Sequence, residues 1–576
     1  MVNVKNLFGM AVMATALVGC SSNDNLAPDG KDNVGKTGEA YASFKINLPT
    51  TTGTGTRGEG DPAQGTPSFE NGDKNEYAVK DATLILFKKN DSGDFVFKQV
   101  VDLGNMEPWT SSDANGITTT AKLTAKITNA EVGANKGYYA LIVLNNNSGT
   151  AAKISYPSEN QTYAAWSQNA DNATAANYLK YDNGFFMANA PKYVAGAPET
   201  LVEIKNIYAS KQQAENSTAT TVYVERGLAK VSLATGSESK HVDITEGNYK
   251  NDQVDITGWT LDVTNTKTFP VHVTDGLWAD TWKTATTPAA GNGATMDRFH
   301  DTNTEFPRVY WGLDPNYKEN FTSVDACEKE FTMATKGSFK TGDEAKKAQY
   351  CLENTFDIDH MVQGQTTRVL FSAKYKPANF ADGETFYKFG NSPKLWHEAD
   401  VVAQIKAKAQ EVLGEADADK VTVTLAAEGN DMTEAGVRLV AAANITYGTT
   451  ALKTEQVDQI NTKLGFKKAT STDAAVGLST FKSGVSYYIA RVKHFNALTP
   501  WNPGDKTYDG NNANWLGRYG VLRNNWYELS VSSVSGPGYP DVPKVNPTDP
   551  DDENKQFINV EVKILKWAKR SQQVEL

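Results

Sequence analysis

The sequence has little cysteine, little histidine and few long apolar runs. Three cysteines and six histidines stand among 576 residues, and the histidines never recur at a metal-ligand spacing. This scarcity gives no support to a disulfide framework or to metal catalysis, and no cofactor is expected. Lysine and arginine (57) are outnumbered by aspartate and glutamate (68), and the net charge of −11 gives no attraction to phosphate backbones. Nucleic acid is therefore not an expected partner.

The apolar run that stands out is Leu7–Val18, which follows Lys5 and is too short to cross a bilayer as a lone helix. It predicts a signal peptide over residues 1–19. The run ends in Leu-Val-Gly-Cys, which resembles a bacterial lipobox, so Cys20 is the expected acylation site. An ordinary secretory signal with a chance cysteine is the alternative. Membrane contact is expected only through the lipid of the precursor.

Residue types typical of strands and turns, such as threonine, valine, tyrosine and asparagine, are plentiful. The patterns predict a mainly β protein. A hairpin is expected at 81–100, turning about Asn90–Gly93, and further strands at 137–146, 221–233, 254–266 and 366–377. The strand at 221–233 opens a second domain, with a boundary near residue 215. Two amphipathic helices are expected, at Glu398–Leu413 and Thr454–Leu464.

The two ends of the chain carry matching alternating patterns. The first presents one apolar face made of Ala42, Phe44, Ile46 and Leu48. The second, near the end, presents a face made of Ile558, Val560, Val562 and Ile564. Each predicts a strand that could fill one position in a sheet. The second follows a linker rich in proline, aspartate and glycine, 536–556, which is expected to be extended and solvated, and it has no obvious partner in its own domain.

Arg57 stands alone in a tract of threonine and glycine directly after the first strand. Such a tract is pliable enough to enter a protease cleft. A cut between Arg57 and Gly58 would remove residues 20–57, which hold the lipid, a polar tether and the first strand. The position left open would expose backbone amides and apolar area that a strand of another subunit can fill, and repetition of that contact builds a fibre.

The alternative is that the first strand stays in place, Arg57 is an ordinary loop residue, and the last strand pairs within its own domain.

Other motifs carry less weight. Gly30–Thr37 spells a phosphate-binding loop, but a polar tether precedes it and a strand follows, where a strand and a helix are required. Cys327 and Cys351 could pair with each other, and a Cys/His catalytic pair also stays open. Three acidic stretches are interpreted as solvated turns or loops: Asp357–His360, Glu415–Lys420 and Asp549–Glu553.

With these features the sequence resembles the type V pilins, the fimbrillin family of Bacteroidales, and within it the shaft subunits of short, minor fimbriae. The resemblance rests on Leu17–Cys20, the tract around Arg57, and the segments VYVERGLAKVSL, YCLENTFD and WYELSVSSVSGPG with INVEVKILKWAKRSQQVEL. It implies two transthyretin-like Greek-key β-sandwich domains, 58–215 and 216–576, with a few helices inserted in the second.

The resemblance further implies that Cys20 is acylated, that an arginine-specific protease cuts the Arg57–Gly58 bond, and that residues 557–576 supply the donor strand. The implied partners are other copies of the chain in a head-to-tail polymer, accessory tip and anchor subunits, and receptors on host or bacterial surfaces. The implied location is a surface fimbria, with the precursor a lipoprotein of the outer membrane. No enzymatic activity is expected. Two other classes stay open: a lipid-anchored, glycan-binding surface lipoprotein that uses some of the 11 tryptophans and 24 tyrosines, and a surface hydrolase.

Overall fold

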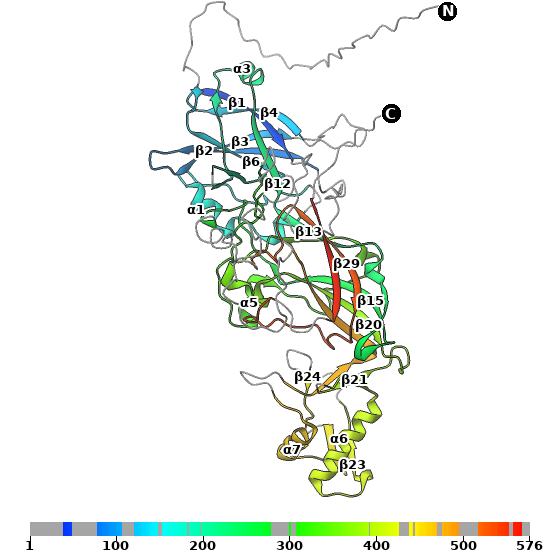
Figure 1. Ribbon diagram of the computed structural model, residues 1–576. Coiled ribbons are helices and arrows are strands. Elements are labelled where there is room, and N and C mark those ends of the chain that lie inside the picture. Colours follow the sequence, from blue (N-terminus) through cyan, green and yellow to red (C-terminus); the bar gives the residue numbers. More distant parts are fainter. Residues whose placement is uncertain are drawn as a thin grey trace, which may run out of the picture. The chain divides into compact units, whose positions relative to one another are not determined.

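The alternating patterns build a mainly β fold, as the sequence predicts, whose strands form two sandwiches and a smaller inserted lobe (Figure 1). Residues Glu39–Leu576 belong to one compact unit. The computed structural model describes residues 38–48, 76, 78–105, 120–147, 152–180, 184–195, 197–277, 299–300, 307–390, 392–425, 437–441, 444–468, 475–494, 516–551 and 557–566.

The first sandwich is an eight-stranded sheet that folds over, so that strands from both of its ends pack on a common core. The path of hydrogen-bonded neighbours runs β3 (Phe95–Asn105), β2 (Asp81–Lys89), β6 (Tyr138–Leu144), β7 (Met187–Asn189), β12 (Thr220–Arg226), β1 (Glu39–Asn47) and β4 (Thr120–Thr128), with β10 (Val202–Glu203) on β6. Strands β2 and β6 also face a second core on their other side, formed with helix α1 (Tyr163–Ser167). Both faces are buried, which explains their continuous apolar sequences.

The hairpin predicted at 81–100 is confirmed as β2 and β3, and the strand predicted at 137–146 is β6. Shorter elements complete this half of the chain. They are β5 (Gly133–Ala134) with β11 (Asn206–Ile207), β8 (Lys192–Val194) with β9 (Ala197–Glu199), and helices α2 (Ala175–Tyr178) and α3 (Lys211–Glu215).

The second sandwich packs two sheets against one core. The first sheet has the order β19 (Gln349–Leu352), β13 (Leu228–Leu233), β29 (Asn525–Val534) and β30 (Ile558–Lys566). The second has the order β14 (His241–Asp243), β15 (Gln253–Asp262), β20 (Arg368–Lys376) and β28 (Val485–Arg491), with β18 (Lys340–Thr341) on β15. A small pair, β16 (Thr264–Asn265) with β17 (Phe331–Thr332), and helix α5 (Val324–Glu330) lie in the same half of the chain. The strands predicted at 254–266 and 366–377 are thus confirmed as β15 and β20.

The inserted lobe has its own apolar core. Its strands are β21 (Phe386–Phe389), β22 (Leu395–Trp396), β24 (Val437–Arg438) and β27 (Leu478–Phe481) in one sheet, and β23 (Val421–Val423), β25 (Ile445–Tyr447) and β26 (Thr450–Ala451) in another. Both predicted helices are confirmed, as α6 (Glu398–Leu413) and α7 (Thr454–Leu464). In α6 the residues buried against the lobe are Val401, Ile405 and Ala409, which recur at the spacing of one helix face.

The prediction of one strand over 221–233 is wrong, because β12 ends at Arg226 and β13 begins at Leu228 in a different sandwich. Gly227 lies between these two strands, where the chain passes from the first sandwich to the second. A Cβ at this position would lie 2.0 Å from Tyr178 Oη, and its amide donates to the carbonyl of Phe186 at 3.0 Å. Glycine is therefore required by a close approach of chain segments. The domain boundary near residue 215 remains a prediction.

The substitution Gly227→Ala is expected to lower the free energy of unfolding by about 1–3 kcal/mol, because the added methyl group overpacks the site against Tyr178. Urea denaturation followed by tryptophan fluorescence measures the change. Gly337→Ala is the matched control, since a Cβ there would meet nothing nearer than Thr335 Oγ1 at 3.8 Å. Equal stability of the two variants would show that Tyr178 moves aside without cost.

The packing of the second half corrects one further expectation, that of a solvated linker, and settles the pairing of Cys327 and Cys351, which the sequence left open. The linker predicted to be solvated is mostly buried or half-buried over its described residues 536–551, of which only Lys544 and Thr548 are exposed. Tyr539 bridges to Tyr487 of β28, and Val545 is buried. Its prolines keep the segment extended, and its few apolar residues are enough to attach it to the sandwich. Cys327 and Cys351 do not pair; both are free and buried, in α5 and β19.

Candidate functional site

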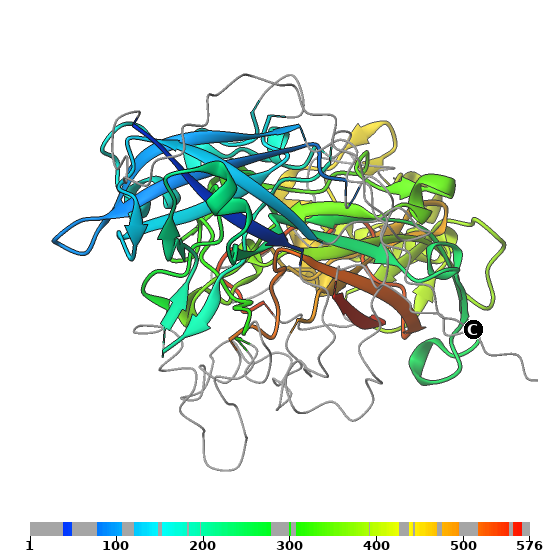
Figure 2. The same ribbon diagram turned by 90° about the horizontal axis from the view of Figure 1, so that it is seen from above.

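The candidate site is the position of β1 in the first sheet, between β12 and β4. Strand β1 pairs antiparallel with β4 over its whole length, and parallel with β12 over residues 44–47 (Figure 2, where β1 is the darkest blue arrow). We call this position the slot. Because β1 is a central strand and not an edge strand, both of its backbone edges are hydrogen-bonded, and both of its neighbours depend on it.

The apolar face predicted for β1 is confirmed. Ala42, Phe44 and Ile46 are fully buried and Leu48 is 7% exposed, and all four belong to the core shared with β2 and β6. The opposite face is less exposed than the alternation predicts, because α3 covers part of it: Ser43 Oγ donates to the carbonyl of Ala214 at 2.7 Å. At about 1.5–3 kcal/mol for each large apolar side chain, burial of this face is a substantial part of what holds β1.

The terminal strand lies elsewhere and has a partner in its own domain, which corrects the sequence interpretation. Strand β30 pairs antiparallel with β29 (Figure 2, neighbouring orange and red arrows). The predicted donor positions Ile558, Val560, Val562 and Ile564 stand opposite Val534, Val531, Leu529 and Tyr527 in the register. Among the strands that the structure describes, β30 has a neighbour on one edge only. It is an edge strand, whereas β1 is central.

Three predicted site residues, Cys20, Arg57 and Gly58, lie outside the described residues, as does Gly30–Thr37. Acylation and cleavage therefore stay predictions. Within the described ranges, no group of three or more His, Cys, Asp or Glu side chains is placed to hold a metal ion, and no helix is long and apolar enough to span a membrane. Asp357–His360 is a turn closed by a contact between His360 Nδ1 and Asp357 Oδ1.

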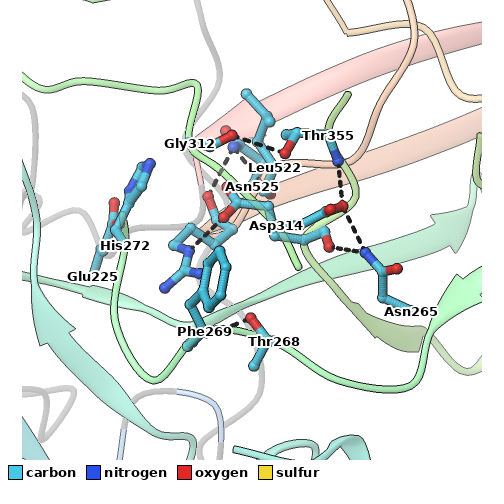
Figure 3. Close-up of polar contacts among 12 residues, drawn as sticks. Glu225, Asn265, Thr268, Phe269, His272, Gly312, Asp314, Thr355, Leu522 and Asn525 are labelled. Carbon is cyan, nitrogen blue, oxygen red and sulfur yellow. Dashed lines mark hydrogen bonds and ion pairs between the residues drawn. The ribbon is translucent and has the colours of Figure 1, made fainter. Parts of the chain in front are cut away.

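Buried charges hold the C-terminal end of β12, the end that lies away from the slot, a feature that sequence reasoning missed. Glu225 Oε2 accepts from Arg308 Nε at 2.8 Å. Its Oε1 lies 2.6 Å from Nδ1 of His272, and Figure 3 labels both of these residues. Burial alone would raise the pKa of Glu225, but the adjacent Arg308 guanidinium and His272 outweigh it, so the pKa lies below its ordinary value. The sequence holds one sign of these buried charges: Glu225 and Arg226 stand side by side at the end of an apolar strand.

A second buried acidic side chain, that of Asp314, is labelled in Figure 3. It accepts from the backbone amides of Thr355 and Asn316, each at 2.8 Å, and from Asn265 Nδ2 at 2.7 Å. Burial outweighs these donors and raises the pKa of Asp314 to about 7. The group therefore keeps its proton in the folded chain at a pH at which the unfolded chain has lost it.

This pKa predicts a pH dependence of stability. Between about pH 4 and pH 7 the folded state binds more protons at Asp314 than the unfolded state, so its contribution to the free energy of unfolding falls as pH rises. In Asp314→Asn that contribution is absent. The stability advantage of the parent over Asp314→Asn, measured by urea denaturation at pH 5, 6 and 8, is expected to shrink with rising pH. A constant difference would mean that Asp314 is already ionised at pH 5.

The fold and these two strands place the chain among mainly β, sandwich-forming proteins. A more specific likeness covers its end. Residues 479–573, which include β28, β29 and β30, match the family model of the C-terminal region of fimbrillin, the major fimbrial subunit protein type IV. No curated protein matches the chain.

Several solved structures resemble the chain at low identity. One, provisionally assigned to cell adhesion and from Parabacteroides distasonis, is 9% identical with a TM-score of 0.37, covering 93% of this chain and 99% of that one. Another with the same provisional assignment, from Bacteroides eggerthii, is 11% identical with a TM-score of 0.32, covering 91% and 96%. A fimbrial assembly protein from P. distasonis is 12% identical with a TM-score of 0.18, covering 54% and 98%. These TM-scores are low, and the sheets alone define the fold.

Proposed function

We propose that the chain is a structural subunit of a surface fimbria, and that β1 is a placeholder for a strand of another subunit. In this proposal a protease cuts after Arg57, β1 leaves the slot, and residues 557–576 of a second copy enter it. The match of residues 479–573 to fimbrillin supports the class of function. The observation that carries the mechanism is the central position of β1 between β4 and β12.

The number of backbone ladders that each strand forms predicts the direction of the strand exchange. In the uncut chain β1 forms two ladders, and β30 forms one with β29. Once β1 is lost, β4 and β12 have no partner at the slot, and the core that held Ala42, Phe44, Ile46 and Leu48 is open to water. A strand that moves from an edge into the slot gives up one ladder and gains two. The cut therefore turns an unfavourable exchange into a favourable one.

The finer parts of the proposal come from the sequence. The precursor is exported as a lipoprotein acylated at Cys20, reaches the outer membrane, and becomes a shaft subunit that grows by head-to-tail addition. Accessory tip and anchor subunits complete the fimbria, which mediates adhesion to host or bacterial surfaces. The chain has no enzymatic role in this proposal.

The test is to treat purified precursor with an arginine-specific protease, sequence the new N-terminus, and look for ladders on gels run without boiling. The parent is expected to begin at Gly58 after treatment and to form ladders. Arg57→Ala is the matched variant, and it is expected to stay uncut and monomeric. Polymers of Arg57→Ala as abundant as those of the parent would refute the placeholder role.

A further inference from the structure

A buried ion pair anchors the chain at Glu76, which follows the proposed cut in the sequence. Glu76 is fully buried, and its carboxylate lies between Lys230 Nζ, at 2.7 Å from Oε1, and the hydroxyl of Tyr350, which donates at 2.5 Å. The side chain of Lys230 is only 5% exposed. Its Nζ also lies 3.7 Å from the centre of the Trp526 ring. Each charged group is thus paired where water does not reach it.

The partners of Glu76 form one row across the second sandwich. In the register, Lys230 of β13 stands opposite Tyr350 of β19 on one side and opposite Trp526 of β29 on the other. These are three neighbouring strands of the sheet that ends in β30. Glu76, which precedes β2 of the first sandwich in the chain, is therefore attached to the middle of a sheet of the second sandwich.

The backbone of the same residue holds the end of β12. Arg226 Nε donates to the carbonyl oxygen of Glu76 at 2.7 Å, and its Nη1 donates to Asn524 Oδ1 at 3.2 Å. Arg226 is the last residue of β12 and is itself buried. The carboxylate of Glu76 thus contacts the second sandwich while its carbonyl contacts the strand that borders the slot.

Strand β12 depends on this end once β1 is gone. Its residues 220–223 pair with β1, whereas its pairing with β7 is confined to residues 224–226. Loss of β1 therefore removes the ladder partner of the first half of β12 and leaves the strand held from its far end. Glu76 follows Arg57 in the chain, so a cut there leaves the anchor with the retained part.

We propose that Glu76, with Lys230, Tyr350 and Arg226, is a positioning site that keeps β12 in place while the slot is empty, so that the incoming strand meets a preformed wall. This inference rests on the proposed function, since it assumes that β1 is removed. Preformed geometry matters because ordering β12 during capture would consume part of the binding free energy. Before the cut, the Glu76 ion pair is expected to contribute little to the position of β12, because β1 then pairs with β12 directly.

The test uses the full chain before and after cleavage, with a labelled synthetic peptide of residues 557–576 as the probe. The main variant is Glu76→Gln with Lys230→Met, which removes both charges of the ion pair together, a change that proteins often tolerate, while Arg226 keeps its hydrogen bonds to the carbonyl of residue 76 and to Asn524. The matched control is Glu131→Gln with Lys88→Met, which removes an ion pair that is solvent-exposed on the same sandwich. Thermal midpoints of the uncut chains are expected to agree with that of the parent.

After cleavage the variants are expected to separate. The parent and the control capture the peptide equally, whereas the Glu76 variant captures it at least about tenfold more weakly. Hydrogen exchange of the cut proteins without peptide is expected to show faster exchange over residues 220–226 in the Glu76 variant alone. Amides of β15 and β20 report on the second sandwich and are expected to be unchanged.

The outcomes distinguish the two levels of the proposal. Equal capture and equal exchange over residues 220–226 in the cut parent and the cut Glu76 variant would overturn the positioning role and leave the proposed function intact. Failure of the cut parent to capture the peptide would count against the proposed function. Exchange over residues 220–226 would then still decide whether Glu76 holds β12. A Glu76 variant that is destabilised before the cut would contradict the inference, because the anchor would then be ordinary structural support.

Discussion

An oxidised Ala42→Cys/Ala125→Cys chain is expected to be cut after Arg57 and yet to form no polymer until a reductant is added. Ala42 of β1 and Ala125 of β4 stand opposite each other in the register, and both are buried. Opposite residues of antiparallel strands have Cα atoms about 4.5–5.5 Å apart, which suits a disulfide. The bond would keep β1 in the slot after its peptide connection is cut, so no donor strand could enter.

Unboiled gels of the protease-treated chain, run with and without reductant, measure the effect. Cys20→Ser in every sample removes the lipid and the remaining thiol outside the described residues, while Cys327 and Cys351 are buried and do not compete. Each single cysteine variant is the control and is expected to polymerise under both conditions. If the oxidised double variant forms ladders like the parent, β1 need not leave the slot and assembly uses another surface.

The parts of this arrangement that the sequence predicted are local. The alternation around Phe44 predicts which side chains of β1 face the core, and the spacing of Val401, Ile405 and Ala409 predicts α6 with its correct ends. In each case the signal lies within a few residues, because strand and helix periods are local properties of the chain. The slot itself is not local, since its walls come from β4 and β12, far from β1 in the sequence.

What the sequence could not predict depends on contacts between distant residues. The break at Gly227 follows from the approach of Tyr178, and the pairing of β30 with β29 spans a linker whose composition suggests solvent exposure. Glu76 gives no signal at all, because an isolated glutamate in a polar stretch is normally exposed. Its burial is explained only when Lys230, itself far along the chain, is placed beside it.

Deletion of Phe557–Leu576 is expected to abolish self-assembly while leaving cleavage and the slot intact. The deletion removes the donor strand and exposes one edge of β29, but Tyr527, Leu529 and Val531 of β29 keep their places in the core. A milder variant, Val562→Asp with Ile564→Asp, retains the strand and replaces part of its apolar face. A charge that enters the slot unpaired is costly, so this variant is also expected to form no ladders.

A mixture of two variants tests whether the loss of self-assembly is specific to the donor strand. A cut chain that lacks residues 557–576 has an open slot and no donor, whereas uncut Arg57→Ala has a donor and a filled slot. Together they are expected to form a dimer with one copy of each and nothing longer, because each supplies a single half of a head-to-tail contact. Light scattering of the mixture measures the mass. Longer polymers from either variant alone, or from the mixture, would place the assembly contact outside the slot and the terminal strand.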